Sequence, residues 1–501
     1  MPERYILAID QGTTNTKGLL VNRSGKPMFG ASAPVHIANP QPDWVEQDPL
    51  EIWGSVLSVV NQCVAKIPDK KIDGIGISNQ RETVLVWERE TGKALAPAIV
   101  WQCRRSANIC ASLKREGHEA MLRERTGLGI DPLFSASKLA WLMDSVPGLR
   151  KRAENGEVCA GTVDSWLIWN LTGGAAHQCD VTNASRTQLF DIYRQAWDNE
   201  LLSLFSVPKK VLPEVMPSSS IFGTTAAVSS LTAGIPIASA IGDSHAAMVG
   251  HGSCSPGTIK ATYGTGSSLM TLVPEPKPAS HKLVSTIAWA LPCHTQYALE
   301  GNITMTGAAL QWVGELLGLK DPIQDAISLS ETVADAGGTY LVPAMVGLGA
   351  PYWDQSVRGA ILGLTRSSSA AHLARAAVEA IAYQVRDVFE AMQIEAECEL
   401  PILQADGGGS RNDRLMQFQA DILGRPVVRS TCADLSALGA AGLAGLAIGY
   451  WPSIPSFGDL ITSGEKFCPR MSDEERARHY DGWLRSVAQA RFPHATKACT
   501  D

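Results

Sequence analysis

Acidic, cationic and hydroxyl side chains gather in a turn close to the N-terminus, in the segment DQGTTNTK at positions 10–17. Its candidate residues are Asp10, Thr13, Thr14, Asn15 and Lys17. Backbone N–H groups, hydroxyls and a cation can surround phosphate oxygens, and an aspartate at the end of a strand can hold hydrated Mg²⁺. An ordinary hairpin turn has a similar composition, so this segment alone leaves both interpretations open.

A run of three glycines, Gly407 to Gly409, lies between a predicted strand at 400–405 and a predicted helix at 414–423. Backbone without side chains can approach a flat or phosphorylated ligand, and the N-terminus of the following helix favours anions. A nucleotide contact and a plain loop both fit. The dinucleotide motif G-x-G-x-x-G is absent, because Asn412 stands in the place of its last glycine, which disfavours a Rossmann domain.

Asp243 ends an apolar segment and precedes a helix-like one. At the carboxyl end of a strand, its carboxylate would face the crevice where α/β proteins bind ligands and could accept a proton from a hydroxyl. It could equally be the N-cap of that helix. Arg81, Glu82 and Trp101 suit a polyhydroxy ligand, because the charges bind hydroxyls while the indole covers carbon. Separately, each also fits a surface ion pair or the core.

Two strand meanders must position these residues. The predicted strands of the first are 5–10, 17–22 and 27–33, and those of the second are 258–264, 267–273, 285–291 and 296–301. Each meander contains a Gly-Thr turn, in DQGTT and in YGTGS, as a duplicated domain would. With the intervening helices, the pattern predicts an α/β protein of two domains with mixed sheets, residues 1–247 and 248–501.

Three helices and one further strand are also predicted. Asp48 and Pro49 predict a helix start with an N-cap and a proline in its first turn. An apolar face over 369–392 predicts a long helix, and Ser472 caps a predicted last one. A further strand is predicted over 72–78, directly before Asn79 and Arg81.

The composition of the chain argues against several classes of protein. A chain of 501 residues exceeds one hydrophobic core, and 45% apolar with 19% charged residues predicts a folded protein rather than a disordered one. A net charge of −7 gives no broad attraction to nucleic acid or anionic lipid. The uncharged stretch 435–458 is interrupted by Pro452, so it predicts a packed helix and no membrane insertion.

The eleven cysteines, from Cys63 to Cys499, form no C-x-x-C pair and indicate reduced thiols in a cytoplasmic protein. Glu3, Arg4 and Asp10 leave no room for a signal peptide. The sequence contains neither a P-loop nor a G-x-S-x-G motif, and its histidines lack metal-ligand spacing.

Ordered motifs across nearly the whole chain resemble those of the FGGY carbohydrate kinases, in particular the glycerol kinases. They are DQGTT (10–14), SNQRET (78–83), IVWQCRR (99–105), GTVDSWLIW (161–169), TNASRT (182–187), YGTG (263–266), GLGAPYWD (347–354), GAILGLTRSSSAAHLARAAVE (359–379) and DILG (421–424).

The resemblance implies two actin-like, ribonuclease-H-like domains with mixed sheets, closing over a cleft that binds Mg-ATP and a small polyol. Asp10 would organise Mg²⁺. The implied nucleotide and phosphate residues are Thr13, Thr14, Asn15, Lys17, Thr265, Gly307, Gln311, Gly408 and Asn412. Arg81, Glu82, Trp101 and Asp243 would hold the polyol, with Asp243 as the base.

Three positions depart from the glycerol kinase pattern. Leu133 replaces a tyrosine, Ser244 a glutamine and Ser268 a phenylalanine. The smaller side chains suggest a larger substrate-binding site and a four- or five-carbon polyol or ketose. The alternative is a glycerol kinase whose neighbouring side chains refill the space. Gly234 stands where some bacterial glycerol kinases have an arginine that binds fructose 1,6-bisphosphate, which predicts no such inhibition.

Two other function classes stay open at this stage. An actin-like ATP-binding switch would consume ATP without a polyol, and an NAD-linked polyol oxidoreductase would need no ATP. Self-association into a homo-oligomer is compatible with the sequence. The joint presence of Arg81, Glu82, Trp101 and Asp243 favours the kinase.

Overall fold

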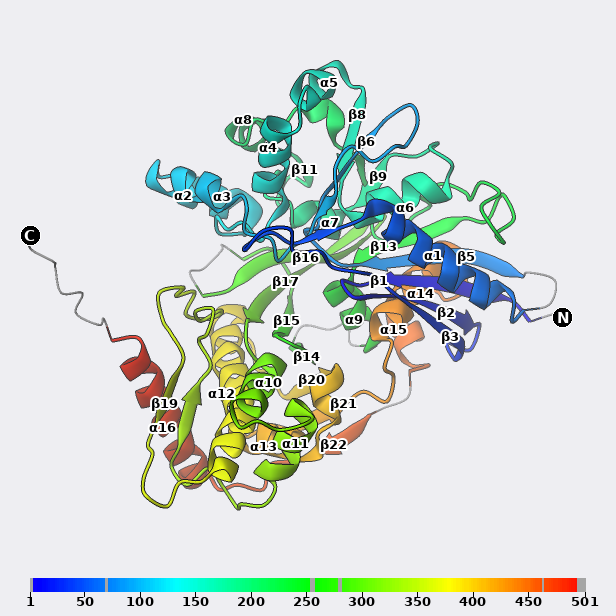
Figure 1. The fold of residues 1–501 in the computed structure, drawn as a ribbon. Coiled ribbons are helices and arrows are strands. Elements are labelled where there is room, and N and C mark those ends of the chain that lie inside the picture. The colour runs from blue at the N-terminus through cyan, green and yellow to red at the C-terminus, as the bar shows by residue number, and fades with distance from the viewer. Residues whose placement is uncertain (1–2, 68–70, 253–256, 278–281, 462–463, 493–501) are drawn as a thin grey trace, which may run out of the picture.

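The computed structural model describes residues 3–67, 71–252, 257–277, 282–461 and 464–492. A five-stranded and a seven-stranded sheet, each flanked by helices, form its two halves (Figure 1). Cys254 and Cys499 lie outside the described residues. The cysteines of the described residues are free thiols.

The first sheet has the strand order β13-β5-β1-β2-β3. Its strands are β1 (Tyr5–Gln11), β2 (Asn15–Asn22), β3 (Pro27–Pro34), β5 (Ile72–Asn79) and β13 (Ile237–Gly242). The first three form the predicted antiparallel meander, whereas β5 pairs in parallel with β1 and with β13. Because β1, β5 and β13 are parallel, their carboxyl ends meet at one edge of the sheet.

Helices and short strands surround this sheet. They are β4 (Glu46–Gln47), α1 (Pro49–Val64), β6 (Leu85–Glu88), β7 (Ala98–Ile99), α2 (Ala107–Arg115), α3 (Glu119–Thr126), α4 (Ser135–Ser145), α5 (Leu149–Asn155), β8 (Val158–Gly161), α6 (Val163–Leu171), β9 (Gln178–Asp180), α7 (Val181–Ser185), β10 (Phe190–Asp191), β11 (Ala196–Trp197), α8 (Asn199–Leu204) and β12 (Glu214–Met216).

Helix α1 begins as its sequence predicts. The Asp48 side chain accepts a hydrogen bond from the backbone N–H of Leu50, and Pro49 occupies the first turn, where no N–H partner is needed. Ile52, Val56 and other apolar residues of one face are buried in the core beneath the sheet.

The second sheet has the order β16-β17-β15-β14-β20-β21-β22. Its strands are β14 (Thr258–Tyr263), β15 (Ser267–Val273), β16 (Val284–Leu291), β17 (His294–Ile303), β20 (Ile402–Asp406), β21 (Val427–Arg429) and β22 (Glu465–Phe467). The remaining elements are α10 (Gly307–Leu316), α11 (Pro322–Ser330), β18 (Tyr340–Val342), β19 (Ala360–Leu362), α12 (Ala370–Ala396), α13 (Asp413–Leu423), α15 (Ile454–Gly458) and α16 (Asp473–Ala490). Strands β14 to β17 are antiparallel but do not form the predicted meander, because β15 pairs with β17 and β16 lies at the edge of the sheet. The hairpins β14–β15 and β16–β17 are present, and α12 and α16 are the predicted long and last helices.

Two helices join the halves. Helix α9 (Asp243–Gly250) continues directly from β13, and α14 (Leu435–Ala447) returns from the second half of the chain to the first sheet (Figure 1). Leu438 and Ala441 of α14 share a buried cluster with Ile6 and Ala8 of β1. Within the described residues, no helix is long and apolar enough to cross a membrane.

Gly439 allows α14 to lie directly against α9, because a Cβ atom there would be 1.8 Å from the carbonyl oxygen of Ala246. We expect Gly439→Ala to lower the free energy of unfolding by about 3 kcal/mol, as overpacking forces the helices apart. Urea denaturation followed by circular dichroism measures this. Gly54→Ala in α1 is the control, since its Cβ would meet no atom within 4 Å; it should stabilise by about 1 kcal/mol. Equal effects would contradict the role of close packing.

Candidate active site

Residues from three strand ends meet at one edge of the first sheet. The register pairs Asp10 of β1 with Ser78 of β5, and Gly242 of β13 with Asn79. The Ser78 hydroxyl donates to the Asp10 carboxylate at 2.9 Å. Asp243 follows Gly242, so the parallel strands bring the first predicted turn and the predicted base to the same place.

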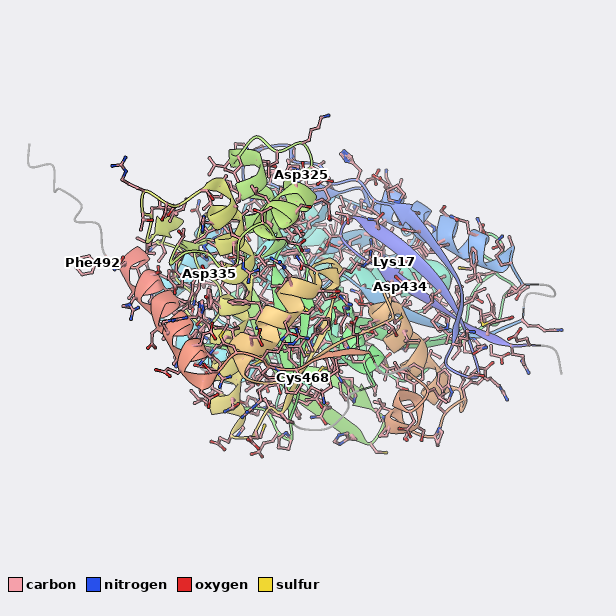
Figure 2. All side chains as sticks on the ribbon, turned by 90° about the horizontal axis from the view of Figure 1, so that it is seen from below. Lys17, Asp325, Asp335, Asp434, Cys468 and Phe492 are labelled. Carbon is pink, nitrogen blue, oxygen red and sulfur yellow. The ribbon has the colours of Figure 1, made fainter. Side chains whose placement is uncertain are left out.

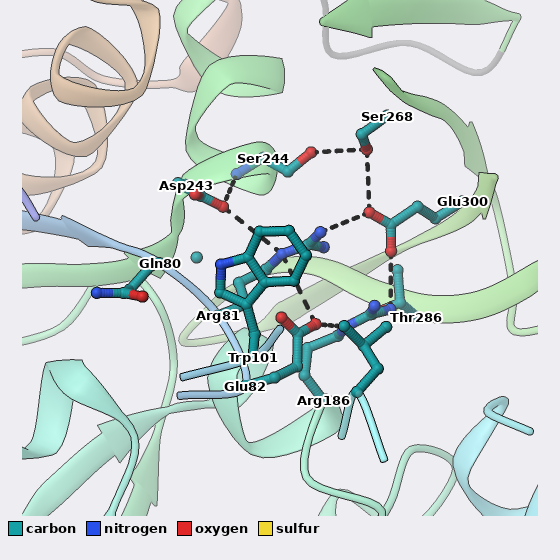
Figure 3. A network of polar contacts seen from close by, with 12 residues as sticks. Gln80, Arg81, Glu82, Trp101, Arg186, Asp243, Ser244, Ser268, Thr286 and Glu300 are labelled. Atoms are coloured by element: carbon teal, nitrogen blue, oxygen red, sulfur yellow. Dashed lines mark hydrogen bonds and ion pairs between the residues drawn. The ribbon is translucent and has the colours of Figure 1, made fainter. Parts of the chain in front are cut away.

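A buried network of ion pairs lies beside Asp243 (Figure 3). Glu300 of β17 contacts Arg81 Nη2 and Arg186 Nη1, each at 2.8 Å, and Arg186 Nε contacts Glu82 at 2.6 Å. The side chains of Arg186 and Glu300 are completely buried. The two arginines hold the pKa of Glu300 well below its usual range despite burial, which opposes this. The network therefore fixes Arg81 and Glu82 in place.

Asp243 is the first residue of α9 and is not its N-cap, which is Gly242. Its carboxylate accepts a hydrogen bond from the Ser244 N–H at 2.6 Å and lies 3.6 Å from Arg81 Nε. The side chain is 39% exposed, whereas its ionic neighbours are nearly or fully buried. Burial raises the pKa of Asp243 above its usual value, although Arg81 and the N–H of Ser244 oppose this shift. The arrangement offers an accessible carboxylate beside a fixed guanidinium.

The predicted polyol residues are close together in the structure (Figure 3). The Trp101 indole Nε1 donates to the Thr13 hydroxyl at 2.9 Å, which connects the indole to the first turn. Glu82 has a positive φ of 61°, a strained conformation for a non-glycine residue, and Arg186 holds its carboxylate there. Arg81 Nη1 is buried without a hydrogen-bond partner among the described residues.

Leu133 has a different environment from the other predicted polyol residues. It is partly buried against an apolar cluster that includes Val84 and Phe134. Its carbonyl oxygen accepts a hydrogen bond from Lys138 Nζ, and burial lowers the pKa of Lys138 to about 8. The Leu133 side chain therefore packs against the apolar cluster, while the hydrogen bond from Lys138 holds its backbone in place.

The predicted phosphate turn lies on the Asp10 side of the site. Thr14 and Asn15 are exposed, and Lys17 pairs with Asp10 across the β1–β2 register. Lys17 Nζ forms an ion pair with Asp434 at 2.8 Å (Figure 2). A phosphate at this position would therefore compete with Asp434 for Lys17.

Asp10 suits a divalent cation. Burial, together with the nearby Asp243 carboxylate, raises the pKa of Asp10 to about 6. A cation between these carboxylates would remove their repulsion, and carboxylate oxygen is a ligand that Mg²⁺ prefers.

Three of the predicted nucleotide residues, Thr265, Gly307 and Gly408, lie shortly after the ends of β14, β17 and β20. The N–H of Gly307 donates to the Gly264 carbonyl at 3.0 Å, which places it beside Thr265. Gly407, with φ of 84°, brings the glycine run close to β14, because a Cβ there would be 2.5 Å from the Tyr263 carbonyl oxygen. Gly408 is exposed at the start of the next turn. Both loops therefore lie against the carboxyl end of β14.

Two other predicted nucleotide residues have local partners. Asn412 is the N-cap of α13 and accepts a hydrogen bond from the N–H of Leu415 at 3.0 Å. Gln311 is exposed on α10 and donates to Glu315 at 2.9 Å. Any contact with a nucleotide would be additional to these roles.

Sequence comparison adds the decisive observation. Residues 5–250 match the N-terminal domain, and residues 259–448 the C-terminal domain, of the FGGY family of carbohydrate kinases. The chain belongs to this family. Glycerol kinases of Desulfitobacterium hafniense and Symbiobacterium thermophilum are each 47% identical to this kinase, over 97% and 98% of its length and 99% of theirs.

A solved structure agrees with this assignment. Plasmodium falciparum glycerol kinase with ADP superposes on this kinase with a TM-score of 0.92 and 32% identity, over 98% of this chain and 99% of that one. The predicted class of fold, two actin-like, ribonuclease-H-like domains with mixed sheets, is confirmed, and so is the prediction of a kinase.

Sequence reasoning missed three buried charges of this kinase: Arg186, Glu300 and Lys260. A signal was present, because Lys260 and Glu300 interrupt otherwise apolar predicted strands. A charge in a buried strand requires a partner of opposite sign. The pattern does not say which residue that partner is.

We expect Glu300→Gln to destabilise the kinase by about 3 kcal/mol or more, since the two buried arginines, Arg81 and Arg186, would then share only the single negative charge of Glu82. Urea denaturation measures the loss, and the KM for the polyol should rise as Arg81 moves. Glu390→Gln is the control, because Glu390 pairs with Arg386 on α12 and is 46% exposed. That change should cost less than about 1 kcal/mol. A Glu300 variant as stable as its control would contradict the importance of the network.

Proposed function

We propose that this kinase transfers the γ-phosphoryl group of Mg-ATP to a hydroxyl of a small linear polyol, glycerol or a longer homologue. The observation that carries the proposal is the accessible Asp243 carboxylate, fixed beside Arg81, Glu82 and Asp10. The relatives named glycerol kinase support a polyol substrate. The family and the Plasmodium structure with ADP support an adenine nucleotide.

The reaction depends mainly on the alignment of the attacking hydroxyl with the γ-phosphorus. Arg81 and Glu82 would orient the polyol, with Trp101 against its carbon atoms. Asp243 would accept the proton of the attacking hydroxyl. That oxygen forms a bond to the γ-phosphorus, the bond from the γ-phosphorus to the bridging oxygen breaks, and ADP leaves.

The opposite side would bind the nucleotide. Thr265, Gly307 and Gly408 offer backbone close to the cleft, with Gln311 and Asn412 at its border. Thr13, Thr14, Asn15 and Lys17 would contact the phosphates. Asp10 would hold Mg²⁺, which supplies charge neutralisation on the phosphates when bound.

The reduced thiols and the polyol phosphate product fit a cytoplasmic location. The alternative, an actin-like ATP-binding switch, has no support among the relatives described above. It would hydrolyse ATP equally with and without a polyol, so polyol-dependent ADP release distinguishes the two.

We expect Asp243→Asn to lower kcat by about 10³-fold, since an amide cannot accept the hydroxyl proton. Coupled ADP release measures turnover, and titration calorimetry should show unchanged nucleotide binding. Asp144→Asn is the control, because Asp144 is exposed on α4 and pairs only with Arg150 among the ion pairs of the described chain. Turnover retained by the Asp243 variant would mean that another group accepts the proton.

We expect millimolar fructose 1,6-bisphosphate to leave activity unchanged, because Gly234 provides no cation for a phosphate. Initial rates with the bisphosphate are compared with rates in sodium sulfate of matched ionic strength. A loss of activity specific to the bisphosphate would show that other residues form an inhibitory site.

A further inference from the structure

A chain of four polar groups runs past Asp243 from Lys260 to Glu300. Lys260 Nζ donates to Ser244 Oγ at 2.9 Å, Ser244 Oγ and Ser268 Oγ are 3.1 Å apart, and Ser268 Oγ donates to Glu300 Oε1 at 3.1 Å. We call these four residues the serine relay. Figure 3 shows Ser244, Ser268 and Glu300 in a row beside Asp243 and Arg81.

Strand register explains how the relay forms. Met270 of β15 is opposite both Lys260 of β14 and Glu300 of β17, so the two charges flank it. Ser268 lies two residues before Met270 and therefore on the same face. Ser244, in the first turn of α9, completes the chain from the other half of the molecule.

The direction of every hydrogen bond in the relay follows from its Glu300 end. Two arginines keep the Glu300 carboxylate ionised, so it can only accept. Ser268 therefore gives its single proton to Glu300, and Ser244 gives its own to Ser268. Lys260 must then donate to Ser244. Each hydroxyl has one proton and two lone pairs, so each serine retains one unused acceptor and no unused donor.

The two serines are the accessible part of the relay. Lys260 and Glu300 are fully buried, whereas Ser244 and Ser268 are partly exposed. Their free lone pairs lie beside Asp243, whose carboxylate is also accessible. The relay therefore presents two fixed acceptors, and the ligand group that they fit is a hydroxyl that donates.

We propose that Ser244 and Ser268 bind the hydroxyl of a fourth carbon, so that the preferred substrate is a tetritol. The inference rests on the proposed function. In the binding mode proposed above, a triol would place one hydroxyl at Asp243 and two at Arg81 and Glu82, which would leave the relay without a ligand. A tetritol supplies the additional O–H donor. A carbonyl can only accept, so a ketotetrose with its carbonyl at this position would meet two acceptors and be disfavoured.

The test compares kcat/KM for glycerol, erythritol, threitol and erythrulose by coupled ADP release. We expect one of the tetritols to exceed both glycerol and erythrulose by roughly 10-fold, since a matched hydroxyl gains a hydrogen bond that the others lack. Ser244→Ala and Ser268→Ala should lower the value for that tetritol by roughly 10- to 100-fold, mainly through KM, and change that for glycerol by less than about threefold.

Controls separate recognition from structure. Ser267→Ala removes the neighbouring hydroxyl of β15, which bonds Thr306 at 3.0 Å on the other face, and should leave the tetritol-to-glycerol ratio unchanged. Ser268→Thr keeps a hydroxyl and should therefore retain much of the preference for the tetritol that Ser268→Ala loses. If an alanine variant fails to fold, the wild-type ratios alone decide.

The possible outcomes distinguish failure of the proposed function from failure of the tetritol inference. No ADP release with any polyol would overturn the proposed function and this inference with it. Glycerol preferred over both tetritols by the wild type would overturn the inference alone. So would alanine variants that lose glycerol and tetritol activity equally, because the serines would then be structural.

Discussion

Glu300 reaches from the second sheet to two arginines of the first half of the chain, and the site depends on this contact. Arg81 lies only 3.6 Å from Asp243, and Arg186 also holds the strained Glu82. One buried carboxylate thus positions the guanidinium and the carboxylate predicted to bind the polyol. A buried ion pair adds little net stability but penalises every arrangement that separates its charges. Its contribution here is a defined geometry.

Helix α9 connects Asp243 with the predicted nucleotide residues. It begins at Asp243, and its C-cap residue His251 contacts Asp406 at 2.7 Å, directly before the glycine run. Helix α14 packs so closely on α9 that Gly439 admits no side chain. The predicted base and the glycine run are therefore connected through one closely packed helix, which suits a reaction that depends on alignment.

Local signals explain what could be predicted from the sequence. The first meander and the start of α1 at Asp48 depend on residues a few positions apart, and they are present as predicted. The second meander is not, because β15 pairs with the more distant β17 and not with β16. The contacts that shape the site are not local. Arg186 and Glu82 are 104 residues apart, and Lys17 and Asp434 are 417 apart. A single sequence indicates that a buried charge needs a partner, but only the register of the sheets selects it.

The three departures from the glycerol kinase pattern illustrate the same limit. Residue size alone predicts that Ser244 and Ser268 leave space, which neighbouring side chains could refill. The structure adds the direction of the hydrogen bonds, because Lys260 and Glu300 lie at opposite ends of the two hydroxyls and engage both of their protons within the relay. Water in an unspecific gap could donate or accept, whereas this pair can only accept. On this proposal, selectivity follows from hydrogen-bond polarity and not from volume, because a bound ligand without a donor would cover the two partly exposed serine acceptors and leave them unpaired.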